Sequence, residues 1–246
     1  MGWRQFTEKK GAKVFRYSPF CEIMSVQEAW VQPGAGDTCW LCGRLARMFL
    51  CRACSEGLAA YRRERGRSTF QGRPIFFAAP HGGLFREKML DFKFRRKHSL
   101  GKGMAYLMAQ SWLEGAGVLP DLLVPVPQGP WKEKQRGFSP SQRLAWELSG
   151  IIGVPVSQSL SKKDTRALSL IRGNREALLS ETMTWKGRER DCRLLVIDDV
   201  WTTGATMREA FRALEAAGFQ ALSFLAFGRR EGKGRTDIWF PHWRGL

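Results

Sequence analysis

The chain has 246 residues, 43% of them hydrophobic, and a formal net charge of +17 at pH 7. This length fits one good-sized domain, or a domain with a small appendage. No apolar run approaches the roughly 20 residues that a membrane-spanning helix needs, which argues against a membrane span. The basic balance indicates an anionic partner such as nucleic acid or a phosphorylated small molecule, although a solvated basic surface has the same composition.

The first 38 residues show no convincing periodicity and are predicted to form a partly irregular N-terminal extension. They are basic but contain no apolar core of the kind found in secretory signals, so we expect a cytoplasmic protein. Met24 is an alternative start of the chain.

Four of the six cysteines lie in one short segment, with the spacing Cys39-x2-Cys42-x8-Cys51-x2-Cys54. Two CxxC pairs at this distance are typical of a tetrahedral zinc site with four thiolates. A closed set of four ligands leaves no open position, so the zinc is expected to be structural. Free thiols or a redox pair are the alternatives. We predict a zinc-binding module over residues 39–58, followed by a second domain over residues 59–246.

After a polar, basic stretch at 61–74 that is predicted to end in a linker, strands and helices alternate. Apolar runs predict strands at 74–79, 122–127, 194–197 and 221–227. Helical spacing predicts a basic helix over 83–97, with Leu84, Met89, Leu90 and Phe92 on one side, and helices over 101–114, 139–152 and from about 205 to 217. The helix predicted over 139–152 begins with a capping box, because Ser139 is followed by Pro140 at the first helical position and by Gln142 three residues on. This order predicts an α/β fold with a mostly parallel sheet flanked by helices.

The segment LLVIDDVWTTGAT places two acids at the carboxyl end of a buried strand, where ligands of parallel sheets bind. The following turn leads into a helix, whose first N–H groups and positive dipole end favour an anion. The predicted phosphate site consists of Thr202, Thr203, Gly204, Ala205 and Thr206. Asp198 and Asp199 would repel a phosphate, so we expect them to hold sugar hydroxyls or a hydrated Mg²⁺. Together they indicate a ribose 5-phosphate group, the alternative being an ordinary turn with two solvated acids.

A second anion site is predicted where the strand at 122–127 ends in a proline- and glycine-containing loop. The residues after it are basic and are expected to form a mobile loop that closes over a diphosphate. The predicted pyrophosphate-binding residues are Val126, Pro127, Gln128, Lys132, Lys134 and Arg136. A solvated basic loop is the alternative interpretation.

The acid pair followed by TTGAT resembles the signature of type I phosphoribosyltransferases. The cysteine array, FKFRRK, VPVP, RGF and DDVWTTGAT occur in the order typical of the ComF family, phosphoribosyltransferase-like competence proteins of bacteria. After RGF this chain has Ser139-Pro140 in place of the family's usual Asn-Gln, and it also departs from the family pattern at 165–177. The resemblance implies 5-phosphoribosyl 1-diphosphate and Mg²⁺ as ligands, with ribose bound by Asp198 and Asp199. It also implies a role in DNA uptake, single-stranded DNA as a partner, and helicase or DNA-processing competence proteins as further partners. The alternative is an active cytosolic phosphoribosyltransferase of nucleotide metabolism.

Three stretches mix basic and aromatic residues, as proteins that bind single-stranded DNA do: 61–63, 92–97 and 239–244. For 92–97, an amphipathic helix with a core face and a basic solvent face is the alternative, and many of the 10 tryptophans must belong to the core. No catalytic base is assigned, because His81, His98 and His242 have no spacing typical of a catalytic or metal site.

Overall fold

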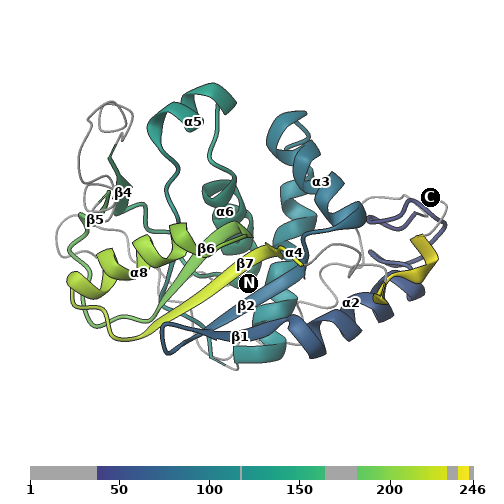
Figure 1. Ribbon diagram of the computed structural model, residues 1–246, viewed down its shortest axis with the longest axis horizontal. Coiled ribbons are helices and arrows are strands. Elements are labelled where there is room, and N and C mark those ends of the chain that lie inside the picture. The colour runs from purple at the N-terminus through teal and green to yellow at the C-terminus, as the bar shows by residue number, and fades with distance from the viewer. Residues whose placement is uncertain (1–37, 117, 164–181, 232–237, 244–246) are drawn as a thin grey trace, which may run out of the picture.

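The protein is represented by a computed structural model that describes residues 38–116, 118–163, 182–231 and 238–243 (Figure 1). The predicted N-terminal extension lies outside these residues except for Thr38, and so does the stretch 165–177. Among the described residues, no helix is long and apolar enough to cross a membrane.

A five-stranded sheet with the order β1-β2-β7-β6-β3 forms the centre of the molecule. The four strands β2 (Arg73–Pro80), β7 (Leu222–Arg229), β6 (Leu194–Trp201) and β3 (Leu122–Pro125) are parallel to their neighbours. Only β1 (Arg67–Phe70) is antiparallel, at one edge. The central strands are nearly continuous apolar runs because both faces of the sheet are covered.

One face of the sheet is covered by α2 (Arg52–Arg65), α3 (Gly83–Phe94), α4 (Leu100–Ala116) and α6 (Pro140–Ile152). The predicted cap of α6 is present, since the Ser139 hydroxyl accepts a hydrogen bond from the Gln142 N–H at 3.4 Å. The other face is covered by α8 (Ala205–Ala216), which buries Met207, Ala210, Phe211 and Leu214 at helical spacing. A two-stranded sheet, β4 (Leu160–Lys162) with β5 (Met183–Trp185), packs beside α8. The predicted fold class is confirmed.

Three local predictions are wrong, one of them only in part. The stretch 61–74, whose end we expected to be a linker, is instead the end of α2 followed by the β1–β2 hairpin. The turn residues Gln71 and Gly72 of this hairpin have φ values of 51° and 71°. In α3 the predicted core residues Met89 and Phe92 are fully buried, as is Phe85, which we had not named, but Leu84 and Leu90 are only partly buried. The expected mobile loop after residue 129 is helix α5 (Pro130–Arg136), which ends at Gly137 in a left-handed conformation, φ 79°.

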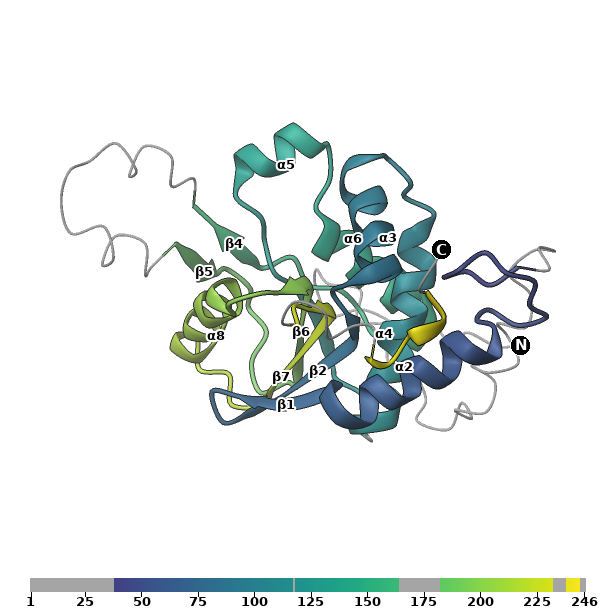
Figure 2. The same cartoon turned by 45° about the vertical axis from the view of Figure 1, so that its right-hand side comes forward.

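The cysteine-containing segment packs against the sheet domain at the end that carries α2 (Figures 1 and 2). Cys54 belongs to α2, which continues to Arg65 and therefore crosses the boundary that we predicted at residue 58. The division into 39–58 and 59–246 stays a proposal. The short helix η3 (Pro241–Trp243) lies beside the same segment in both views.

Candidate functional site

The carboxyl end of β3 lies beside the middle of β6, directly before the acid pair, because Pro125 pairs with Ile197 in the sheet. The Val126 N–H continues this register by donating to the Ile197 carbonyl oxygen at 2.9 Å. The loop after β3 is thereby brought next to the acid pair, and a cleft of about 400 Å³ opens between them. Predicted site residues that line the cleft are Val126, Pro127, Gln128, Lys132, Arg136, Asp198, Asp199 and Thr206.

The two aspartates are held inward by the fold, with only 8% and 7% of their surfaces exposed. One oxygen of Asp198 accepts hydrogen bonds from the Ser141 hydroxyl at 3.1 Å and from the Asp199 N–H at 2.8 Å. Burial, and next the neighbouring Asp199 carboxylate, raise the pKa of Asp198 to about 7. Neither acid points into bulk solvent, so the interpretation of the pair as two solvated acids does not fit the structure.

Lys93 lines the cleft, although from the sequence we expected it to lie on a basic surface, within the stretch 92–97. Its ammonium group lies 2.8 Å from the Asp199 carboxylate, and its side chain is 15% exposed. The signal for this position was present in the helix pattern, because Lys93 follows buried Met89 by four residues on the same side of α3. A lysine on a buried helix face needs a partner, and the acid pair provides one.

The turn after β6 has the geometry expected of an anion-binding helix start. Gly204 adopts a left-handed conformation, φ 74°, and offers no side chain to cap α8. The Ala205 N–H donates to the Thr203 hydroxyl at 3.4 Å, so the N–H groups that follow it in the first turn of α8 are the ones placed to meet a ligand. Thr206 lines the cleft, whereas Thr202, Thr203 and Ala205 are exposed on the turn beside it.

Close packing beneath this turn explains the requirement for glycine. A Cβ atom at position 204 would lie 2.6 Å from the Trp201 ring. Trp201 in turn packs edge-on against Phe70 and Phe77 of the core. The turn is thus held in place by the core residues on which it packs.

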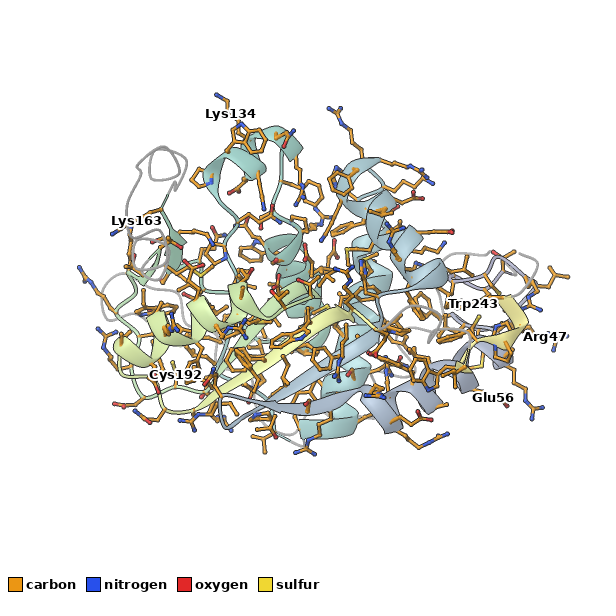
Figure 3. The ribbon with its side chains drawn as sticks, viewed as in Figure 1. Arg47, Glu56, Lys134, Lys163, Cys192 and Trp243 are labelled. Atoms are coloured by element: carbon orange, nitrogen blue, oxygen red, sulfur yellow. The ribbon has the colours of Figure 1, made fainter. Side chains whose placement is uncertain are left out.

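Helix α5 forms the opposite wall of the cleft. The Arg136 guanidinium donates to the Gln128 side-chain oxygen at 3.0 Å and lies over the Phe94 ring, 4.8 Å from its centroid. Lys134 does not line the cleft, but lies on the outer side of α5 and points away from it (Figure 3). Lys162, absent from our predictions, lines the cleft and pairs with Glu209 at 2.7 Å.

The cysteine cluster has the dimensions of a zinc site. The four sulfur atoms of Cys39, Cys42, Cys51 and Cys54 all lie within 4.8 Å of one another, and two of them are 3.7 Å apart. Four thiolates at the usual zinc–sulfur distance of about 2.3 Å are separated by roughly 3.8 Å at the corners of a tetrahedron. The pKa of the Cys39 thiol is lowered to about 4, chiefly by its hydrogen bond with Cys54. These residues fit a structural zinc ion.

In two of the three basic–aromatic stretches, aromatic side chains belong to the core. Tyr61 is fully buried, and Arg62 uses its guanidinium for the Ala78 and Leu107 carbonyl oxygens. Trp239 and Phe240 are core residues. In the remaining stretch, 92–97, the Phe94 side chain is 59% exposed and is therefore accessible at the surface.

A parallel sheet with an acid pair at its carboxyl end, followed by an open turn and a helix, defines a phosphoribosyltransferase-like α/β protein with a four-cysteine module. No protein-family model matches the chain. The chain is 28% identical over 189 residues to the competence protein ComFC of Bacillus subtilis. The aligned part covers 74% of this chain and 73% of ComFC. This similarity confirms the resemblance to the ComF family.

The solved structures include the purine phosphoribosyltransferase of Pyrococcus horikoshii, which is 18% identical. The match covers 52% of this chain and 70% of that enzyme with a TM-score of 0.32.

Proposed function

We propose that this chain binds 5-phosphoribosyl 1-diphosphate together with Mg²⁺ in the cleft, and that it acts in the cytoplasm in DNA uptake for natural transformation. The choice of ligand is supported by the position of the acid pair. In the cleft, Asp198 and Asp199 are accompanied by Thr206 from the start of α8 and by Gln128, Lys132 and Arg136 from the loop and helix after β3. The similarity to ComFC supports the role in competence.

Each part of the ligand has a matching group in the cleft. Asp198 and Asp199 accept hydrogen bonds from the ribose hydroxyls, and the first N–H groups of α8 with the Thr206 hydroxyl hold the 5-phosphate. Lys132, Arg136 and Lys93 surround the diphosphate with positive charge.

The carboxylate oxygens of the acid pair are the ligands that Mg²⁺ prefers, so the donor set fits a magnesium ion carried by the diphosphate. When bound, the ion neutralises charge on the diphosphate. The protein's own contribution is to position the ribose and to hold its hydroxyls in a site shielded from water.

Calorimetric titration of 5-phosphoribosyl 1-diphosphate with Mg²⁺ tests the proposal. Binding is expected for the unmodified chain and not for the Asp198→Asn/Asp199→Asn double variant. Asp121→Asn is the matched control, because Asp121 is a carboxylate paired with Arg193 at the opposite end of β3 and β6. Equal binding by the chain and its double variant, or no binding by either, would contradict the proposal.

Lys93 gives a second test that separates the diphosphate from the sugar phosphate. Because a hydrogen bond to a charged group contributes about 1.5–3 kcal/mol, Lys93→Met is expected to weaken diphosphate binding by roughly 10- to 100-fold. Binding of ribose 5-phosphate, which lacks the diphosphate, should change less. Equal losses for both ligands would assign Lys93 to the maintenance of the acid pair alone.

Single-stranded DNA is the proposed macromolecular partner, with helicase or DNA-processing competence proteins as further partners. The supporting observation is an aromatic and basic rim at the mouth of the cleft. Trp131 and Phe94 are 46% and 59% exposed, and Lys132 and Arg136 lie beside them. Exposed rings next to basic groups suit base stacking combined with phosphate contacts. Binding measured over a salt series should weaken steeply with salt, and an affinity insensitive to salt would argue against this partner.

A further inference from the structure

The C-terminal residues of the described chain pack directly on the cysteine cluster. In Figure 3, Trp243 lies beside the cluster segment, while Arg47 lies at its outer end. The Nε2 atom of His242 lies 3.4 Å from the sulfur of Cys54. A second link runs from the cysteine loop, where the Arg44 guanidinium donates to the His242 carbonyl oxygen at 3.4 Å.

Aromatic packing fixes His242 in this position. Trp239 packs edge-on against Tyr61 of α2, with ring centroids 5.1 Å apart. Phe240 is fully buried, and its ring stacks on Trp243 at 4.1 Å.

Gly57 of α2 allows the C-terminal segment to approach this closely. A Cβ atom at position 57 would lie 2.4 Å from the Trp239 carbonyl oxygen and 2.8 Å from the Phe240 ring. The part-buried contact between His242 and Cys54 therefore follows directly after a segment that is anchored in the core by Trp239 and Phe240.

The imidazole is not a fifth member of the ligand set. Among the described residues, only the four cysteines form a group whose ligand atoms all lie within 4.8 Å of one another, and the His242 nitrogens fall outside it. Four thiolates around one Zn²⁺ carry a net charge of −2, and Cys54 is fully buried. Such a sulfur needs N–H donors around it, because a buried charge without them is costly. His242 is placed to supply one.

We propose that His242 donates its Nε2–H to the Cys54 thiolate of the zinc centre, so that the centre is completed by a residue from the far end of the chain. Metal binding then also stabilises the segment Ile238–Trp243, because this donor contact and the packing of the segment form together. Partners outside the ligand set typically change metal affinity by about 10- to 100-fold.

The experiment measures zinc affinity by competition with a chromophoric chelator in the full chain and three variants. His242→Ala is expected to weaken zinc binding by about 10- to 100-fold. His242→Gln, which keeps an N–H donor, should recover part of this loss. Arg47→Ala is the matched control, an exposed basic residue of the same segment, and it should bind zinc as the unmodified chain does.

Cobalt substitution separates a donor role from a merely structural one. Loss of a hydrogen bond to sulfur raises the energy of its lone pairs. The thiolate-to-cobalt charge-transfer band should therefore shift to longer wavelength in His242→Ala, and less in His242→Gln. Hydrogen exchange of residues 238–243 should speed up when the metal is removed by chelation.

Three results would overturn the proposal. One is a His242→Ala variant with unchanged zinc affinity and an unshifted charge-transfer band. Another is an equal loss of zinc affinity in Arg47→Ala, and the third is an unmodified chain that binds neither zinc nor cobalt.

Discussion

Replacing Asp198 by asparagine should make the protein more stable at neutral pH while removing ligand binding. Asp198 is buried, and its pKa is raised to about 7, first by burial and then by Asp199. Asparagine has nearly the same shape, and its side-chain oxygen can accept the hydrogen bonds that Asp198 receives from Ser141 and from the Asp199 N–H. The substitution therefore removes a buried acid without removing its contacts.

The direction and size of the effect follow from the pKa in the two states. An unfolded aspartate has a pKa of about 3.9, so between about pH 4 and pH 7 the folded protein keeps a proton that the unfolded chain releases. The contribution of Asp198 protonation to the free energy of unfolding is fully present below about pH 4 and is lost as the pH rises to about 7. A shift of about three pH units, at about 1.4 kcal/mol per unit, corresponds to an upper limit of about 4 kcal/mol.

The assay is urea unfolding of both proteins at several pH values between about 5 and 8. The free energy of unfolding of Asp198→Asn relative to the unmodified chain should increase with pH across this range and level off above about pH 7. Asp121→Asn, in which the altered carboxylate is exposed, should show no such rise. Parallel curves for Asp198→Asn and the unmodified chain would refute the assignment of a raised pKa to Asp198.

Two further substitutions test the turn and the cysteine cluster. Gly204→Ala should cost about 1–2 kcal/mol in urea unfolding and abolish ribose 5-phosphate binding, because φ is 74° and the new Cβ meets Trp201. Gly218 also has a positive φ, 92°, but a Cβ atom there would meet no atom within 4 Å, so Gly218→Ala should leave phosphate binding unchanged. An equal loss of phosphate binding in Gly204→Ala and Gly218→Ala would contradict the role given to the contact with Trp201. Cys51→Ser should lose zinc by metal analysis and unfold at a lower temperature, whereas Cys192→Ser, outside the cluster, should keep both properties. A Cys51→Ser protein with a full complement of zinc would exclude the cluster as the metal site.

Features contained within one short segment were predictable from the sequence. The apolar runs gave β2, β6 and β7, because strands buried on both faces need no partner to be recognised. The buried stripe of α8 followed from helical spacing. The cysteine spacing and the acid pair with its glycine turn are likewise local, since their function depends on residues a few positions apart.

Only the tertiary structure decided which distant residues meet. Lys93 approaches Asp199, and Ser141 approaches Asp198, because α3 and α6 pack on the same face of the sheet and end near the same strands. His242 reaches Cys54 because the C-terminal aromatics fill the space left by Gly57. Composition does not distinguish a lysine or histidine on a solvated surface from one held against a buried anion. That distinction depends on packing, which brings segments far apart in the chain into contact.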